Sequence, residues 1–169
     1  MLQRGDMGAL APLYRRHRGV VNAVVRRQVT GISSSDAEDL CHEVFLELPQ
    51  LASRYRPGNS LKGWLCGIAL RKAWRRTRGE WLRRQLLGRF SEPEREATDA
   101  SAGVEAGQKV RHLLSQLPPT LREVVVLCLI EQLDTAEVAQ ALGVSVNAVW
   151  TRLHRARERL KELEEEASS

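Results

Sequence analysis

The sequence has little cysteine, no clustered histidine and no long apolar run. Only three of its 169 residues are cysteine, and none of them forms a C-x-x-C pair. The four histidines are scattered, so no group of side chains has the spacing of a zinc site. These absences exclude a disulfide framework and predict a protein that binds no metal and no other cofactor. The three thiols lie in apolar stretches and are expected to be buried and reduced.

Signals for secretion, for a membrane span and for a β-sheet are also missing. Residues 1–14 contain no apolar core of a signal peptide, and the apolar run over residues 124–130 is too short to cross a bilayer. Runs of β-branched residues are short, and no Asn-Gly hairpin turn occurs. We therefore expect an all-α protein that stays in the cytoplasm and does not insert into a membrane.

Positive charge is what the chain has in excess. The 26 lysines and arginines outnumber the 21 acidic residues and give a formal net charge of +5. A basic balance of this kind favours a polyanionic partner such as a nucleic acid, although alone it does not identify one.

Helical periodicity recurs in two blocks that a polar stretch separates. Residues 91–107 are acidic, small and polar, and such a composition buries little surface. The pattern predicts two small helical domains, residues 1–86 and 108–164, joined by a flexible acidic linker over residues 87–107. In the first domain Asp6 can cap the first helix, and a long basic helix is expected over residues 61–84. In the second, one helix is expected over residues 119–133.

Residues 135–153 have the spacing of a helix-turn-helix. A small residue, Ala139, stands where the two helices would cross, and Gly143 accepts the positive φ of the turn. Val146 begins an apolar stripe on the second helix, and Asp134 or Thr135 caps the first. In this motif the second helix enters the major groove of DNA. Its outward side chains are therefore expected to contact DNA: Asn147, Trp150, Thr151, Arg152, His154 and Arg155.

The first domain carries two surfaces of opposite charge. The basic helix interleaves cations with Trp64, Trp74 and Trp81, a combination that binds unpaired strands through phosphate contacts and stacking. Trp64 shares a face with apolar neighbours, so the spacing favours a core position for it. The preceding helix is acidic and would repel DNA. Its carboxylates are expected to face solvent or a basic protein: Asp36, Glu38, Asp39, Glu43 and Glu47.

Three stretches resemble an extracytoplasmic-function (ECF) sigma factor of the bacterial sigma-70 family. DAEDLCHEVFLEL (36–48) resembles the polymerase-binding helix of region two, and RYRPGNSLKGWLCGIA (54–69) resembles the promoter-opening loop and helix. Residues 117–160 resemble region four. The resemblance implies a protein that binds core RNA polymerase at the β′ clamp and β flap, recognises promoter DNA and melts it, under the control of an anti-sigma factor. It also implies that the protein is not an enzyme.

The resemblance assigns roles to individual residues. Region two would bind polymerase through Asp39, His42, Glu43 and Leu46, and region four would read the −35 element through the outward residues of the second helix. The −10 element would fall to Asn59, Ser60, Leu61, Lys62, Trp64, Arg71, Lys72, Trp74 and Arg75.

The sequence departs from the family pattern at a few of these positions. Leu70-Arg71 stands where an arginine-asparagine pair is common, Asn147-Ala148 replaces Gly-Thr, and Trp150 occupies a position that is often basic. Two other interpretations remain open: a helix-turn-helix regulator that binds duplex DNA as a dimer without a sigma role, and a protein-interaction module whose acidic helix binds a partner.

Overall fold

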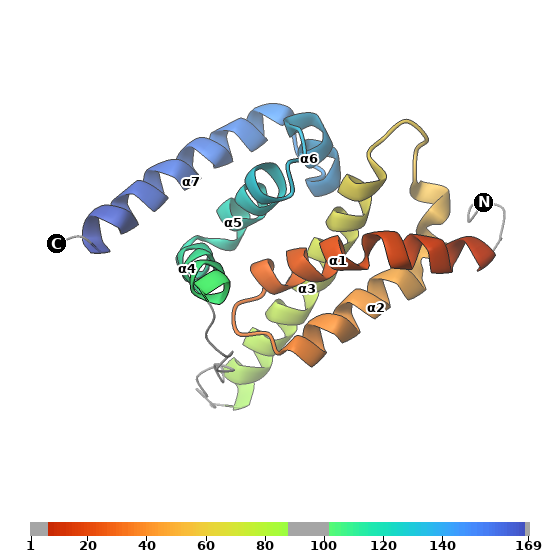
Figure 1. The fold of residues 1–169 in the computed structure, drawn as a ribbon, viewed down its shortest axis with the longest axis horizontal. Coiled ribbons are helices and arrows are strands. Elements are labelled where there is room, and N and C mark those ends of the chain that lie inside the picture. The colour runs from red at the N-terminus through yellow and green to blue at the C-terminus, as the bar shows by residue number, and fades with distance from the viewer. Residues whose placement is uncertain (1–6, 88–101, 168–169) are drawn as a thin grey trace. The chain divides into compact units, whose positions relative to one another are not determined.

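The computed structural model describes residues 7–87 and 102–167, with the side chains of residues 8–79 and 107–166. Within these ranges every regular element is helical (Figure 1). The chain divides into two compact units, residues 1–94 and 95–169. The predicted all-α class with two small helical domains is thereby confirmed. Asp6, the side chain of Trp81 and residues 88–101 of the expected linker lie outside the described parts of the chain.

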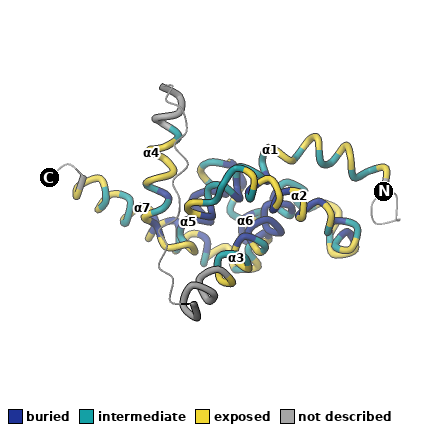
Figure 2. The backbone as a smooth tube through the Cα atoms, turned by 90° about the horizontal axis from the view of Figure 1, so that it is seen from below, coloured by how far each residue is buried: buried dark blue, intermediate teal, exposed yellow. Residues whose placement is uncertain are grey.

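Three helices that all contact one another form the first unit: α1 (Leu10–Gln28), α2 (Ser34–Leu51) and α3 (Leu61–Leu87). Short 3-10 turns precede α1 (η2, Met7–Ala9) and follow α2 (η3, Ala52–Arg54). Apolar residues at helical spacing supply the core, and Figure 2 shows the buried stretches where the helices face each other. The core includes Val21, Val24 and Val25 of α1, Leu40, Val44 and Leu48 of α2, and Leu65, Ile68, Ala69 and Ala73 of α3.

Local capping sets the start of α2 and of α3. The Ser33 hydroxyl accepts a hydrogen bond from the Asp36 backbone N–H at 3.0 Å, which satisfies one of the unpaired donors of the first turn of α2. The Ser60 hydroxyl accepts from the Gly63 N–H at 3.1 Å and does the same for α3. The Ser60 cap fixes the end of the loop over residues 55–60, which connects η3 to α3.

The second unit contains α4 (Ala102–Gln116), α5 (Pro119–Val125), α6 (Thr135–Leu142) and α7 (Val146–Ala167). Its start differs from the sequence prediction, because α4 begins at Ala102 inside the expected linker. The helix expected over residues 119–133 also differs. It is α-helical only to Val125, continues as a π-helical turn (η4, Val126–Ile130), and ends before Gln132, whose φ is +55°.

The helix-turn-helix is formed by α6 and α7. Asp134 caps α6 and, together with Glu137, forms a capping box in which each side chain accepts from the other residue's backbone N–H. Gly143 has φ 69° and ψ 35°, the left-handed conformation that ends α6, and the Ser145 hydroxyl accepts from the Ala148 N–H. Ala139 is buried, as the predicted crossing requires.

One expected core position is wrong. Val146 is 42% exposed, and the fully buried stripe of α7 starts at Val149 and continues through Leu153 and Ala156. Val146 is the first residue of α7, directly after the cap, so the stripe becomes buried only one turn later. Leu142, Val144 and Leu160 are half-buried.

Replacement of Gly143 with alanine is expected to lower the free energy of unfolding of the second unit by about 1 kcal/mol, because a Cβ disfavours the left-handed conformation. No atom lies within 4 Å of the added Cβ, so the cost arises in the backbone alone. Gly19→Ala, in the middle of α1, is the matched control: its Cβ also meets open space, but there alanine favours the helix by about 1 kcal/mol. Urea unfolding measures both, and shifts of the same sign would contradict this account.

Three structural features bear on the absences noted in the sequence. No helix in the described parts of the chain is both long and apolar enough to cross a membrane. Cys41 and Cys66 are buried as expected, whereas Cys128 is only half-buried, and all three are free thiols. Among the described residues no group of three metal-ligating side chains gathers at one place.

Candidate nucleic-acid and protein interfaces

The polar side of α7 is a continuous exposed surface, which we call the α7 outer face. It consists of Asn147, Trp150, Thr151, His154 and Arg155, and all five are exposed. They repeat at helical spacing on the side opposite the buried Val149 and Leu153. Trp150 is 54% exposed, which is unusual for so large an apolar ring. His154 lies 3.3 Å from Glu158 one turn further along.

Arg152, the sixth residue predicted for this surface, is not on it. Its Nη1 donates to Glu123 Oε1 of α5 at 2.7 Å, and the Glu123 side chain is only 8% exposed. Arg152 flanks the buried stripe of α7, so its side chain reaches α5 and neutralises a buried carboxylate. The prediction of a DNA contact by Arg152 is therefore replaced by a structural role that holds α7 against α5.

A buried arginine that the sequence did not single out, Arg122, joins α4 to α5. The Arg122 guanidinium donates to three backbone carbonyls at the end of α4, those of Leu114, Ser115 and Leu117, at 2.7, 3.2 and 3.0 Å. Carbonyls in the last turn of a helix lack the usual backbone partner four residues on, and the negative end of the helix dipole there favours a cation. The Leu114 carbonyl also accepts from the Leu117 N–H at 3.2 Å. Burial lowers the pKa of Arg122, yet the guanidinium stays charged at neutral pH.

The exposed side of α2 forms a second surface, the α2 outer face, made of the four residues predicted to bind polymerase. Asp39, His42, Glu43 and Leu46 repeat at spacings of three and four residues, and all are exposed. Leu46 is 70% exposed, so an apolar side chain lies open among polar ones. The structure thus brings together the complete predicted set. His42 Nε2 also lies 2.6 Å from the Tyr14 hydroxyl in a hydrogen bond, with the two rings stacked.

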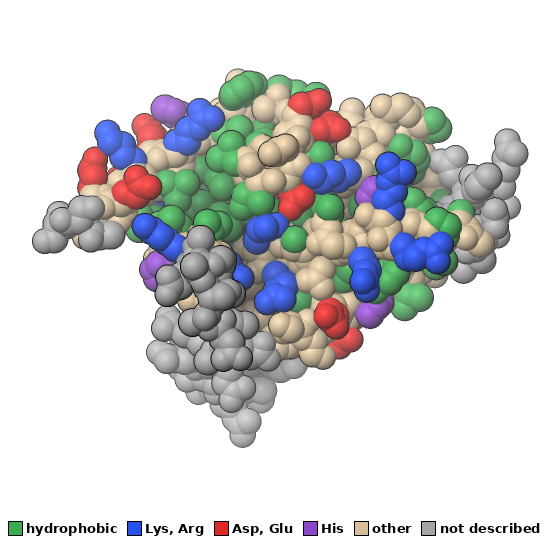
Figure 3. Space-filling view, in the orientation of Figure 1, with side chains coloured by type: hydrophobic (Ala, Val, Ile, Leu, Met, Phe, Trp, Pro, Cys, Tyr) green, Lys and Arg blue, Asp and Glu red, His purple; other side chains and the backbone are tan. Residues whose placement is uncertain are grey.

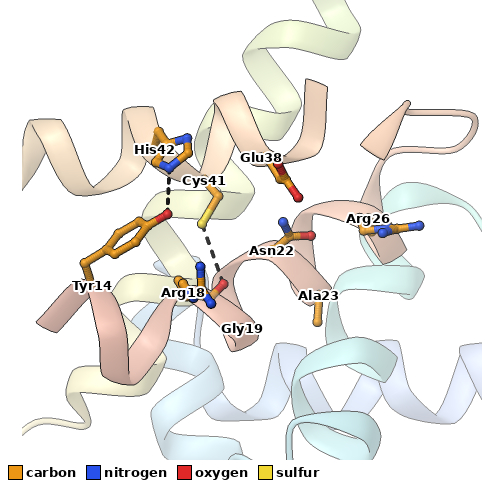
Figure 4. Close-up of a pocket in the computed structure, with 9 residues that line it drawn as sticks. All are labelled: Tyr14, Arg18, Gly19, Asn22, Ala23, Arg26, Glu38, Cys41 and His42. Atoms are coloured by element: carbon orange, nitrogen blue, oxygen red, sulfur yellow. Dashed lines mark hydrogen bonds between the residues drawn. The ribbon is translucent and has the colours of Figure 1, made fainter. Parts of the chain in front are cut away.

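Beside the α2 outer face lies a groove of about 590 Å³ between α1 and α2 (Figure 4). Arg18, Asn22 and Arg26 line it from α1, and Glu38 and His42 from α2. Figure 3 shows Lys and Arg side chains gathered along α1, so this side of the groove is basic. Burial raises the pKa of the Cys41 thiol in its wall, and the thiol donates weakly to the Arg18 carbonyl.

Carboxylates of α2 also pair with cations of α3, which corrects the expectation that all of them face solvent or a partner. Asp36 bonds to Arg76, and hydrogen bonds from Ser33 and Arg76 lower the pKa of Asp36. Lys72 Nζ lies 2.9 Å from Glu43 and 2.8 Å from Glu47. Glu38, Asp39 and Glu43 are exposed on α2, although Glu43 also pairs with Lys72.

The predicted −10 residues occupy the loop over residues 55–60 and one side of α3. The Tyr55 hydroxyl donates to the Asn59 carbonyl at 2.7 Å, and the Tyr55 ring packs against Trp64 with centroids 5.2 Å apart. This contact closes the loop, in which Gly58 has φ 95°. Asn59, Ser60, Leu61 and Lys62 are half-buried at its end.

Trp64 and Lys72 differ from what the sequence predicted. Trp64 is half-buried rather than a core residue, because it lines a groove and packs at a tilt against the Tyr55 ring of the loop. The Lys72 side chain is only 13% exposed and is directed to α2, so it does not join the exposed cations. Arg71, Trp74 and Arg75 are exposed on α3.

Comparison with known proteins identifies the family. The family model "Sigma-70 region 2" matches residues 13–83, and the model "Sigma-70, region 4" matches residues 107–160. The RNA polymerase sigma factor CarQ of Myxococcus xanthus is 33% identical over 164 residues, which cover 94% of this chain and 91% of that protein. The ECF RNA polymerase sigma factor SigD of Mycobacterium tuberculosis is 31% identical and matches 94% of this chain and 78% of SigD.

A solved structure supports the same family assignment. CnrH in complex with the cytosolic domain of CnrY superposes with a TM-score of 0.72 at 28% identity, and the match covers 99% of this chain and 94% of that one. Both halves match in the order that the sequence resemblance implied. The chain belongs to the sigma-70 family, among the ECF RNA polymerase sigma factors.

Proposed function

We propose that the chain is a sigma subunit that binds core RNA polymerase and directs it to promoters, with its tasks divided between the two units. The first unit, region two over residues 1–86, binds polymerase and captures the −10 element. The second, region four over residues 108–164, reads the −35 element. Residues 87–107 join them, and a tether raises the effective concentration of one weak site once the other is bound. The protein catalyses no reaction and works in the cytoplasm, where polymerase is.

The observation that carries this proposal is the α7 outer face. A recognition helix must bury one side in its own domain and present polar side chains at its N-terminal end to the major groove. The buried stripe of α7 and its exposed Asn147, Thr151 and Arg155 meet that requirement. Arg155 can donate two hydrogen bonds to guanine, and the exposed Trp150 ring can contact a thymine methyl group.

The −10 element is assigned to the loop over residues 55–60 and the exposed side of α3. Melting exposes bases that a protein can stack and hold, which offsets an unpairing cost of a few kcal/mol. The Tyr55–Trp64 contact supports a preformed aromatic surface beside the exposed cations Arg71 and Arg75. Lys72 leaves this assignment, since Glu43 and Glu47 already hold its ammonium group.

The α2 outer face is assigned to the β′ clamp of polymerase. An exposed leucine surrounded by polar groups has the composition of a protein-binding hot spot, with an apolar centre and a polar rim. The second unit would contact the β flap. CnrH is solved with the cytosolic domain of CnrY, and the similarity supports an inhibitory protein, an anti-sigma factor, that holds this chain away from polymerase.

Run-off transcription tests the proposal. Bacterial core RNA polymerase is incubated with a promoter library, with and without the chain, and the transcripts are sequenced. We expect transcripts from a defined promoter class only when the chain is present. A chain that yields none, and that instead binds a palindromic duplex tightly as a dimer without polymerase, would be a regulator of the helix-turn-helix type.

Arg155→Ala is expected to weaken binding of the holoenzyme to its promoter by roughly 5- to 150-fold, the equivalent of one base contact worth about 1–3 kcal/mol. Lys161→Ala is the control: it removes a cation from the same helix, but one that lies further from the N-terminal end and pairs with Glu165 at 3.8 Å. Promoter binding is measured by fluorescence anisotropy at one fixed salt concentration. Equal losses for the two variants would show that Arg155 contributes only general charge.

A further inference from the structure

Two large apolar side chains lie exposed next to each other at the start of α7, and we call them the α7 apolar strip. Val146 is 42% exposed and Trp150 is 54% exposed. They are four residues apart, so they are neighbours on one side of the helix. A single exposed apolar side chain is common on a protein surface, whereas an adjacent pair at the end of a recognition helix bears on what that helix contacts.

The first turn of α7 holds the strip in a fixed orientation. The Ser145 hydroxyl accepts from the Ala148 N–H at 3.1 Å, and the Ser145 carbonyl accepts from the Val149 N–H at 3.2 Å. Val149 is fully buried and anchors the opposite side of this turn. Val146 is β-branched, which restricts its χ1 angle. An apolar group that is already ordered loses little conformational freedom when it contacts a ligand.

A polar neighbour of the strip has its hydroxyl proton engaged within the helix. The Thr151 hydroxyl donates to the Asn147 carbonyl at 2.9 Å. Threonine in a helix commonly bonds back to the preceding turn in this way. The Thr151 proton is therefore not available to a base edge, and its methyl group adds to the apolar character of the first two turns of α7.

The charges around the strip favour DNA as its partner over another protein. Arg155 and Arg157 are exposed one to two turns after Trp150, and helical spacing places them on different sides of the α7 outer face. Cations on both sides of a base-reading surface suit the phosphates that border the major groove. Among the four bases thymine alone presents an apolar group there, its C5 methyl. An apolar strip between cations thus matches thymine.

We propose that the α7 apolar strip reads the C5 methyl groups of one or two neighbouring thymines in the major groove, and that Val146 is a base-contacting residue together with Trp150. The inference rests on the proposed function and deepens it, since it states which chemical group of the DNA this end of α7 selects. It also gives a role to Val146, whose helical spacing alone predicted a core position.

Replacement of thymine with deoxyuridine tests the proposal, because it removes the C5 methyl group and leaves every hydrogen-bonding group of the base pair. The full chain first selects its preferred sequence from a pool of short random DNA duplexes. Each thymine of the selected duplex is then replaced in turn, and binding is measured by fluorescence anisotropy at one fixed salt concentration. We expect at least one replacement to weaken binding about fourfold, as for the loss of one buried methyl group.

The double variant Val146→Thr with Trp150→Gln connects that loss to the strip. Both side chains are exposed, so the core of the second unit is unchanged. The deoxyuridine effect should disappear in this variant and persist in Lys161→Gln, which alters an exposed residue three turns further along the same side of α7. The dependence of binding on salt should be the same in the double variant and the unaltered chain, because no charge changes.

Three results would overturn the methyl assignment. One is a selected duplex in which no thymine is sensitive to deoxyuridine. Another is a deoxyuridine effect that is as large in the double variant as in the unaltered chain. The third is a double variant that binds DNA normally but binds core RNA polymerase more weakly, which would make the strip a protein-binding surface.

The outcome is separable from that of the proposed function. If the chain supports transcription but no deoxyuridine replacement matters, only the methyl assignment fails. If the deoxyuridine effect depends on the strip in a chain that supports no transcription, the methyl assignment stands and the sigma role fails.

Discussion

Arg152→Ala is expected to lower the free energy of unfolding of the second unit by about 3 kcal/mol, the low end of the cost of breaking a buried ion pair. The reason is the partner left behind: the Glu123 carboxylate is 8% exposed and loses the cation bound to it at 2.7 Å. We place the value at the low end because Arg152 is itself 28% exposed. Hydrogen exchange of the α5 and α7 amides, measured by mass spectrometry, should become roughly a hundredfold faster.

Two further variants test whether the loss of stability comes from breaking the Arg152–Glu123 ion pair rather than from removing a positive charge. Arg155→Ala removes an exposed arginine three residues further along α7 and is expected to change stability by less than about 0.5 kcal/mol. The double variant Glu123→Met with Arg152→Leu removes both charges of the pair and should regain most of the lost stability. If Arg152→Ala exchanges at the rate of the unaltered chain, the pair does not hold α7 in place.

The exposed side of the recognition helix α7 could be predicted from the sequence, but the direction of one of its side chains could not. The exposed polar side of α7 follows from helical spacing alone, and five of the six residues predicted for it lie there. Arg152 is different because it borders the buried stripe, where an arginine can turn either way. Its direction is decided by Glu123, which is 29 positions earlier in the chain, and no local pattern contains that information.

The same distinction between local and distant causes applies to other residues of both units. The caps at Ser33 and Asp134 were predictable because a cap involves only a few consecutive residues. Lys72 was predicted to contact DNA with its neighbours Arg71 and Arg75, yet it pairs with acids of α2 that are 29 and 25 positions away.

Leu46→Glu is expected to weaken binding to core RNA polymerase by about 30-fold or more, which corresponds to the loss of a hot-spot residue worth about 2 kcal/mol. Leu46 is 70% exposed, so its apolar side chain contributes little to the core of the first unit. Glutamate and leucine have similar helix propensities, and α2 should therefore remain intact. In the complex, however, a carboxylate would replace the apolar centre of the α2 outer face and would lose its hydration without gaining a partner.

The effect on polymerase has to be separated from effects on folding and on DNA. Affinity is measured by titrating a fluorescently labelled chain with core polymerase, and thermal unfolding of the free variant should match the unaltered chain. Arg155→Ala provides the opposite pattern, because it should retain core binding and lose promoter binding. If Leu46→Glu binds core polymerase normally, the α2 outer face is not the clamp contact. The exposed leucine then belongs to a surface for another protein, and the division of tasks between the units would have to be reassigned.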